Sequence, residues 1–318
     1  MTQVACIGEC MIELRQAQGG SAGHLYSRGY GGDTLNTAVY LARLGIAVDY
    51  ITALGDDPMS AEMLAGWAAE GIGTSRVARL PGKLPGLYMI QTDAFGDRSF
   101  FHWRMSSAAR RLMDLPDTDD MLDALASYDV VYLSAITLSI YSARGRTKLI
   151  GALRRAREQG ARIVFDTNFR ASGWPDPKEA RAVLGEAVAA SDIVLASTED
   201  LLPLYPYEED EQLMEHIPSG ELVLKLLRPG SIVRLEGISQ AVRAEPVTHP
   251  VVDTTAAGDS FAAAYIAARL AGAEPAEAAR TGHRLGGVVV GYPGAIIPRV
   301  AMPVDLLPGQ GSSRKGLQ

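Results

Sequence analysis

The strongest chemical signal in this sequence is the segment Asp253-Thr254-Thr255-Ala256-Ala257-Gly258-Asp259-Ser260. It follows a β-branched run at 247–252, which predicts a strand, and it opens a helical apolar pattern that ends at Gly272. Small residues let the backbone approach a ligand, and first-turn N–H groups lack intrahelical partners, so the turn predicts an anion site. Asp259 would lie beside that anion, where we expect it to stay ionised. From there it could deprotonate an alcohol that attacks a phosphoryl group.

This interpretation assigns Asp259 as the general base, with the backbone amides of Ala256, Ala257, Gly258 and Asp259 as the anion hole. The alternative is an aspartate that only stabilises the start of a helix. The spacing of two aspartates around small residues, directly after a strand pattern, favours the catalytic interpretation.

A second segment, Gly31-Gly32-Asp33-Thr34-Leu35-Asn36, opens the first long helical pattern. Its two glycines permit close approach of a ligand. Asp33 supplies an acceptor, and Asn36 supplies both a donor and an acceptor. A Gly-Gly turn alone is more often a simple loop than a binding site, so the evidence for a site comes from its occurrence together with the segment around Asp259.

The rest of the chain indicates how these turns are positioned. Short apolar runs alternate with helical patterns, which predicts an α/β protein with a mostly parallel sheet covered on both faces. Two stretches break this alternation, at 24–30 and at 87–103, the second with a turn at Phe95-Gly96-Asp97. They predict either a small accessory sheet or an edge hairpin of the main sheet. The expected strands are 4–8, 48–54, 130–133, 163–165, 193–195 and 222–226, and the expected helices include 35–42, 60–70 and 178–190.

Both glycine-containing segments resemble those of the ribokinase-like (PfkB) carbohydrate kinases, whose second motif reads Asp-Thr-x-Gly-Ala-Gly-Asp. Ala256 stands where that family usually has its first glycine. Amide donation survives this change to alanine provided that φ is negative there. The resemblance implies a ribokinase-like α/β/α sandwich with a small β-sheet lid. It would place one kinase domain at 1–307, with lid strands within about 9–30 and 84–106. The tail at 308–318 is polar and rich in glycine and serine, so we expect it to be disordered.

The resemblance narrows to the 2-keto-3-deoxygluconate kinases through 4–14, 84–88, 101–104, 165–170 and 294–299. It implies ATP-dependent phosphorylation of the 6-hydroxyl of a sugar acid, whose carboxylate suits guanidinium groups. His102 replaces the tyrosine that is usual in that group. The implied substrate contacts are Gly32, Asp33, Asn36, Tyr88, His102, Arg104, Arg170 and Asp259.

Three of these aromatic and basic positions have ordinary structural alternatives. Arg104 could be an edge-strand charge that discourages sheet pairing. Arg170 could be a surface arginine. Trp103 could offer a ring face to the sugar or belong to the core of the accessory sheet.

The nucleotide side departs further from the family. The resemblance implies ATP contacts from the anion hole and from Asn168, Arg170, Lys225, Gly230 and His283, but Leu226-Leu227-Arg228 replaces a tighter turn. Glu199 and Asp200 stand where the family has a magnesium-organising motif, and they could equally be an acidic helix start. Mg²⁺ is expected with ATP. Asp253 and Thr255 are candidates for a monovalent-cation site, with K⁺ as the ion.

The composition of the chain limits the classes of partner that it can bind. The net charge of −7 over 318 residues argues against a nucleic-acid or anionic-membrane surface. The N-terminus lacks a signal pattern and no apolar run reaches membrane-spanning length, so we expect a cytoplasmic protein.

Cys6 and Cys10 are expected to be small buried side chains without a disulfide or zinc. We also expect a homo-oligomer that pairs through the lid sheet, and surface or loop positions for His24, His216 and His249.

Two rival functions stay open. A fructose, tagatose or related keto-sugar kinase of the same family would need no carboxylate clamp. A non-catalytic sugar-binding regulator on this scaffold would explain the altered nucleotide segments but not Asp259. A dinucleotide oxidoreductase is disfavoured because no Gly-x-Gly-x-x-Gly follows the first strand.

Overall fold

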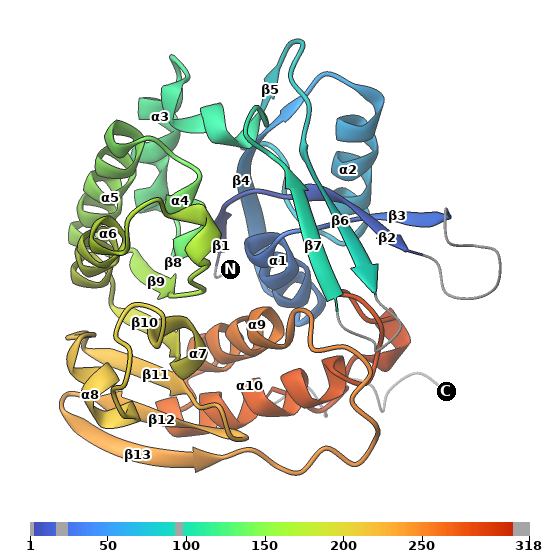
Figure 1. Ribbon diagram of the computed structural model, residues 1–318. Coiled ribbons are helices and arrows are strands. Elements are labelled where there is room, and N and C mark those ends of the chain that lie inside the picture. The colour runs from blue at the N-terminus through green and yellow to red at the C-terminus, as the bar shows by residue number, and fades with distance from the viewer. Residues whose placement is uncertain (1–2, 17–24, 93–97, 308–318) are drawn as a thin grey trace, which may run out of the picture.

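The structure is a computed structural model that describes residues 3–16, 25–92 and 98–307 (Figure 1). His24, the turn at Phe95-Gly96-Asp97 and the tail at 308–318 lie outside the described residues, and so do the predictions made for them. No helix in the described ranges is long and apolar enough to cross a membrane.

A nine-stranded sheet forms the centre of the molecule, in the order β13-β12-β11-β10-β9-β8-β1-β4-β5. From β11 to β5 neighbouring strands are parallel, and β12 and β13 add an antiparallel edge. The predicted mostly parallel α/β sheet is therefore confirmed. The strands are β1 Gln3–Ile7, β4 Ala47–Gly55, β5 Val77–Leu80, β8 Val130–Ser134, β9 Arg162–Asp166, β10 Ile193–Ser197, β11 Glu221–Lys225, β12 Gly230–Leu235 and β13 Ile238–Arg243.

Helices cover both faces of this sheet. In β1, Val4 and Cys6 pack on one face and Ala5 and Ile7 on the other, because successive side chains of a strand point to opposite sides. The first face carries α1 Asp33–Arg43, α2 Pro58–Ala69, α9 Ala257–Leu270 and α10 Pro275–Val289. The second carries α3 Thr118–Asp123, α4 Ala135–Ser139, α5 Ala143–Glu158, α6 Pro177–Ala189, α7 Thr198–Leu201 and α8 Asp210–Glu215, with 3₁₀ turns η1 Ala109–Asp114 and η2 Ala124–Ser127. Two further 3₁₀ turns are η3 Ala171–Gly173 and η4 Arg299–Ala301.

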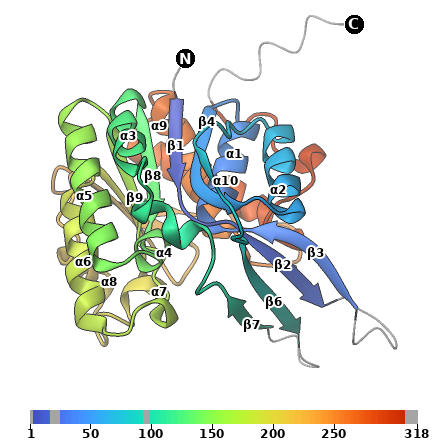
Figure 2. The same ribbon diagram turned by 90° about the horizontal axis from the view of Figure 1, so that it is seen from above.

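A separate four-stranded sheet, here called the lid, has the order β3-β2-β6-β7. Figure 2 shows it projecting from the side of the main body, beyond the end of β1. The accessory-sheet prediction is confirmed and the edge-hairpin alternative is wrong, since none of the four described lid strands pairs with the main sheet. The lid strands are β2 Met11–Gln16, β3 Tyr26–Gly31, β6 Gly86–Thr92 and β7 Arg98–Trp103.

The expected strand at 247–252 is wrong. This run has no regular secondary structure, and Val251 and Val252 are exposed. Pro246 and Pro250 flank its centre, and proline removes the N–H donor that a sheet ladder needs. The segment before Asp253 is thus an irregular connection that runs from the antiparallel edge to α9.

Both cysteines are buried and free, as expected. Cys6 lies within β1 and Cys10 follows it, and burial raises the pKa of the Cys6 thiol well above its usual value. A thiol held protonated in this way is a poor nucleophile and a poor metal ligand.

Candidate active site

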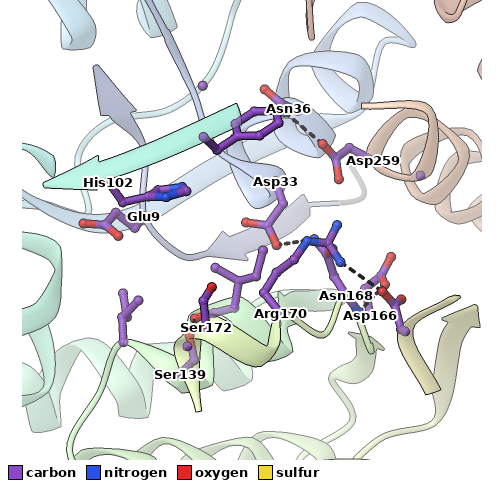
Figure 3. Close-up of a pocket in the computed structure, with 18 of the residues that line it drawn as sticks. Glu9, Asp33, Asn36, His102, Ser139, Asp166, Asn168, Arg170, Ser172 and Asp259 are labelled. Carbon is purple, nitrogen blue, oxygen red and sulfur yellow. Dashed lines mark hydrogen bonds and ion pairs between the residues drawn. The ribbon is translucent and has the colours of Figure 1, made fainter. Parts of the chain in front are cut away.

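A cavity of about 1430 Å³ lies between the lid and the carboxyl ends of the central strands. Ligands of open α/β sheets bind at this edge, because the loops there diverge to both faces. Figure 3 shows its lining, with His102 and Glu9 on one side and Asp259 on the other. The cavity brings together most of the predicted site residues, namely Gly32, Asp33, Asn36, Tyr88, His102, Arg104, Asn168, Arg170, Lys225, Ala256, Ala257, Gly258 and Asp259.

Asp259 lies in the first turn of α9, where its carboxylate accepts a hydrogen bond from Asn36 Nδ2 at 2.8 Å. Burial, reinforced by the negative charge of Asp33, raises the pKa of Asp259 to about 8. The expectation that the helix start keeps this carboxylate ionised is therefore wrong for the ligand-free protein. Loss of solvent outweighs the helix dipole, and the outcome is a base whose pKa is near neutral pH.

Ala256 is the N-cap of α9 and has φ 61° and ψ 14°, in the left-handed region. The condition that φ be negative at Ala256 is therefore not met. The chain must reverse here to enter the helix, and glycine makes this turn without the Cβ penalty that alanine incurs. Ala256 therefore keeps the backbone geometry typical of glycine.

Fewer backbone amides are available to bind an anion than the sequence predicted. The Ala257 N–H donates to the Thr254 carbonyl oxygen at 3.2 Å. The N–H groups of Ala256, Gly258 and Asp259 have no acceptor within the described part of the chain. These three donors, at the positive end of a 14-residue helix, form a site for an anion.

The double-glycine turn packs so closely against neighbouring residues that it has no room for a side chain. A Cβ on Gly32 would lie 2.2 Å from the Glu9 carbonyl oxygen, and one on Gly31 would lie 2.6 Å from the Tyr88 hydroxyl. The turn leads into α1, where Asn36 Oδ1 is buried and has no hydrogen-bond partner within the described residues. Asn36 belongs to the residues that line the cavity, and a ligand hydroxyl that reached this oxygen would supply its missing hydrogen bond.

Both predicted arginines are already paired. Arg104 Nε donates to Glu9 Oε2 at 2.8 Å, and the Glu9 side chain is fully buried. Arg170 Nη1 donates to Asp200 Oδ1 at 3.0 Å, and the Arg170 side chain is 57% exposed. Arg104 is therefore not a free edge charge, and Arg170 lies at the cavity rim.

The two aromatic predictions differ in outcome. The rings of Tyr88 and His102 stack with centroids 5.9 Å apart, and both line the cavity. Partial burial and the charge of Arg104 lower the pKa of His102. Trp103 does not line this cavity. It is 58% exposed and contributes instead to a smaller hollow with Leu87, while Phe100 faces the main cavity.

A chain of polar contacts links the lid to the start of α9. Tyr88 donates to Glu13, which lies 3.0 Å from Arg15. Arg15 Nη1 lies 3.7 Å from Asp253 Oδ2, and the same oxygen accepts the Gly294 N–H at 2.9 Å. The lid strand β2 is thus in polar contact with the turn that precedes the anion site.

On the nucleotide side, Lys225 Nζ lies 3.4 Å from Asp166 Oδ2, and a Cβ built on Gly258 would lie 3.6 Å from that ammonium. Lys225 is therefore next to the anion site. Asn168 Nδ2 donates to Asp33 Oδ2 at 2.9 Å, across the cavity floor.

Two predicted ATP residues do not line this cavity. Gly230 begins β12 with φ 141°, and a Cβ there would lie 2.8 Å from the Val242 carbonyl oxygen. His283 contacts Ser231 Oγ at 3.0 Å and packs edge-on against Phe261. Burial, reinforced by the charge of Lys225, lowers the pKa of His283 to about 4, so it is neutral at physiological pH.

The metal predictions rest on oxygen ligands. Asp33, Asp166 and Asp200 line the cavity, and Mg²⁺ prefers carboxylate, phosphate and water oxygens. Among the described residues no group of three or more His, Cys, Asp or Glu could hold a metal ion by itself. These residues therefore fit a metal ion that arrives bound to a nucleotide.

The cavity residues that sequence reasoning missed include Glu9, Arg110, Tyr141 and Asp166. Glu9 and Asp166 each follow or end a buried strand, which is a signal that sequence reasoning could have used. Arg110 and Tyr141 lie outside any motif, and only the fold brings them to the cavity.

The comparisons with known proteins extend over nearly the whole chain. The model of the pfkB family carbohydrate kinases matches residues 1–302. A 2-dehydro-3-deoxygluconokinase of Dickeya dadantii is 42% identical over 311 residues, covering 94% of this chain and 98% of the relative. A 2-dehydro-3-deoxygluconokinase of Escherichia coli K12 is 38% identical, covering 95% and 99%. A crystal structure of a putative ribokinase II from E. coli, in complex with ATP and Mg²⁺, has a TM-score of 0.79 at 23% identity, covering 93% and 94%.

Proposed function

The chain belongs to the pfkB family of carbohydrate kinases, and from this premise we propose that it phosphorylates 2-dehydro-3-deoxygluconate (2-keto-3-deoxygluconate) at the 6-hydroxyl. ATP is the phosphoryl donor, and the products are 2-keto-3-deoxy-6-phosphogluconate and ADP. Relatives with this name that share 42% and 38% of their residues with the chain support the choice of substrate.

One observation carries the proposal. Asp259 and the free amides of α9 lie at one side of the cavity, while basic side chains gather beside Glu9 at the other. An extended six-carbon acid has its hydroxyl and its carboxylate at opposite ends, so it fits this arrangement. A neutral sugar would leave the basic end without a counter-charge.

Asp259 orients the 6-hydroxyl and accepts its proton as the oxygen attacks the γ-phosphorus. The N–H groups of Gly258 and Asp259 and the ammonium of Lys225 stabilise the charge on the transferring group. Asn36 holds the Asp259 carboxylate in place and offers its free Oδ1 to a sugar hydroxyl. Gly32, Asp33, Tyr88, His102, Arg104 and Arg170 complete the proposed sugar site, with Asn168, Arg170 and Lys225 on the ATP side.

ATP binding with Mg²⁺ is supported by the fold neighbour that contains both. A K⁺ site at Asp253 and Thr255 stays a prediction, and the guanidinium of Arg15, 3.7 Å from Asp253, competes with a cation for that carboxylate. Activity in KCl and in tetramethylammonium chloride at equal ionic strength tests it. Equal rates in the two salts would argue against a required K⁺ ion.

We also propose that 1–307 act as one cytoplasmic kinase domain and that two copies pair through the lid. Support for pairing comes from the exposed outer face of β7, where Phe101 is 43% and Trp103 58% exposed. Exposed aromatic side chains are enriched at protein interfaces. Sedimentation of the wild type and of Trp103→Glu tests this, and a monomeric wild type would contradict it.

A coupled assay of ADP release tests the reaction. It compares 2-keto-3-deoxygluconate with fructose at equal concentration and includes a control without sugar. The proposal predicts ADP release that depends on the sugar acid and is much slower with fructose. A faster rate with fructose would indicate a keto-sugar kinase, and no release with any sugar would indicate a non-catalytic binding protein.

A further inference from the structure

A carboxylate with little access to water lies close to the anion site. Asp253 is 8% exposed and stands three residues before Ala256, the N-cap of α9. Its Oδ1 accepts the Thr255 N–H at 2.9 Å, and its Oδ2 accepts the Gly294 N–H at 2.9 Å. These backbone donors orient the carboxylate but carry no net charge. A positive partner is needed as well, because an uncompensated buried charge is strongly unfavourable.

Asp253 lies where two distant segments of the chain meet. The Val290 carbonyl oxygen accepts the N–H groups of Val252 and Asp253, at 2.8 and 3.2 Å. The contact of the Asp253 side chain with the Gly294 N–H adds a further link. The loop after α10 is thus joined to the segment that leads into α9. A positive charge beside Asp253 stabilises this junction and, through it, the turn that presents the anion site.

The positive partner comes from the lid strand β2. Arg15 Nη1 lies 3.7 Å from Asp253 Oδ2, and the Arg15 side chain is 24% exposed. The same guanidinium lies 3.0 Å from Glu13, so it is placed between two carboxylates. Gly294 has φ 86°, and a Cβ there would lie 3.2 Å from Nη1 and 3.3 Å from Nη2 of Arg15. The lack of a side chain at Gly294 therefore leaves room for the guanidinium.

The groups around Asp253 do not fit a bound K⁺ ion while Arg15 is in place. Potassium-selective sites surround the ion with oxygen atoms that replace its hydration shell. Here both oxygens of Asp253 accept backbone N–H groups, and a guanidinium lies against the carboxylate. A K⁺ ion at this carboxylate would lie close to the charge of Arg15, and like charges repel strongly where solvent is scarce.

We propose that the guanidinium of Arg15 takes the place of a monovalent cation at Asp253, so that the protein needs no K⁺ for stability or activity. Arginine is not deprotonated in proteins, and this one is tethered to the chain. Its presence at the site does not depend on the salt in solution, whereas the occupancy by a dissolved ion does. Arg15 is a positioning residue, since it is not among the residues that line the main cavity.

This inference and the predicted K⁺ site exclude each other as the source of the positive charge at Asp253. Only its activity measurements rest on the proposed function. Its stability measurements are made without substrate, so they hold for whichever sugar the protein phosphorylates.

The first experiment follows thermal unfolding in KCl and in tetramethylammonium chloride at equal ionic strength. The wild type should unfold at the same temperature in the two salts. Arg15→Ala removes the positive partner of Asp253, so in tetramethylammonium it should unfold about 3–6 °C lower than the wild type. KCl should recover at least half of this loss, because a K⁺ ion can enter the space that the side chain leaves.

The second experiment measures ADP release with saturating sugar acid in the same two salts. For the wild type, kcat/KM for ATP should differ less than about twofold between them. Arg15→Ala should lose about tenfold in tetramethylammonium and regain most of it with K⁺ or with low millimolar guanidinium ion. A purely structural defect would not depend on which small cation is present.

Arg28→Ala is the matched control. Arg28 lies on β3, the strand next to β2 in the lid, and it pairs with Glu62 at a position where its side chain is 47% exposed. Its stability and activity should be the same in the two salts. If Arg15→Ala does not fold, Arg15→Gln serves in its place with the same expectations.

Three outcomes would overturn the inference. A wild type that needs K⁺ for stability or activity would show that Arg15 does not replace the ion. Arg15→Ala could match the wild type in tetramethylammonium, or it could lose the same stability in both salts without recovery by K⁺ or guanidinium. ADP release with fructose instead of the sugar acid would refute the proposed substrate, and the unfolding temperatures would still decide this inference.

Discussion

Asn36 Nδ2 donates to Asp259 Oδ2 across 2.8 Å, and this hydrogen bond joins two helix starts that lie 223 residues apart in the sequence. One helix brings the double-glycine turn to the cavity, and the other brings the anion site. The bond also favours the ionised form of Asp259, and it opposes the larger effects of burial and of Asp33 on the pKa of that carboxyl.

Asp259→Asn should lower kcat by about 10²- to 10⁴-fold, because the amide cannot accept the proton of the attacking hydroxyl. The amide still accepts a hydrogen bond from Asn36, so Kd for the sugar acid should change little. Steady-state kinetics and a binding titration check this. Asp119→Asn, at a 72% exposed aspartate, is the control. Turnover near that of the wild type in Asp259→Asn would rule out Asp259 as the base.

The raised pKa of Asp259 predicts a pH-dependent stability. Its pKa is about 8 in the folded protein against an ordinary value of 3.8, so the unfolded chain holds fewer protons between these pH values. Stability should therefore fall as pH rises from about 4 to 8. Asp259→Asn removes this cost, so its stability relative to the wild type should be greater at pH 8 than at pH 4, by more than the ~1.4 kcal/mol that one pKa unit represents. Urea denaturation of both proteins at pH 4 and pH 8 measures it, and an equal difference at the two pH values would contradict it.

The same pKa predicts the pH dependence of the reaction. At ATP concentrations well below its KM, kcat/KM should rise with pH and level off above about pH 8, as the free enzyme loses its proton from Asp259. His283 has a pKa of about 4, so its titration cannot produce a rise in kcat/KM between pH 6 and pH 8. A flat profile between pH 6 and 9 would show that Asp259 is already ionised.

Ala256→Gly should stabilise the protein by about 0.5–1 kcal/mol, because glycine adopts the left-handed conformation of this N-cap without strain. Ala257→Gly, one residue later in the helical region, should have the opposite effect and cost about 0.5–1 kcal/mol. Urea denaturation of the two variants compares them directly. A loss of stability in Ala256→Gly would show that the Cβ of Ala256 makes contacts worth more than the strain.

Arg104→Ala should destabilise the protein by about 3 kcal/mol, since it leaves the buried Glu9 carboxylate without its counter-charge. Arg170→Ala should cost about 1 kcal/mol or less, because Arg170 is largely exposed. Combining Glu9→Gln with Arg104→Ala should restore most of the lost stability. If the double variant is no more stable than Arg104→Ala, the pair is not the source of the loss.

Much of the fold was predictable because its signals are local. Periodic apolar positions located β1, β4, β8 and the helices between them, and the lid followed from two strand patterns without an intervening helix. Prediction was wrong at 247–252, where β-branched residues suggested a strand and two prolines excluded it.

The site was predicted less evenly. Asp259, Asn36 and Tyr88 lie in motifs, so their presence in the cavity could be anticipated. The pKa of Asp259 could not be anticipated, because it depends on burial and on the charge of Asp33. Asp33 is 226 residues away in the sequence, and only the fold brings the two carboxylates together. The pairing of Arg104 with Glu9 and the position of Arg110 also depend on contacts between distant segments, so the sequence does not reveal them.

The contacts from Tyr88 through Glu13 and Arg15 to Asp253 connect the lid with the turn that precedes the anion site. A sugar that draws the Tyr88 hydroxyl away from Glu13 alters the charge balance around Arg15 and Asp253, at the approach to the phosphate site. Thermodynamic reciprocity then requires that ATP change the affinity for the sugar by the same factor as the sugar changes the affinity for ATP. Any coupling between the two substrates that titrations measure therefore has a physical route through β2, which contacts both the sugar side and the turn before the phosphate site.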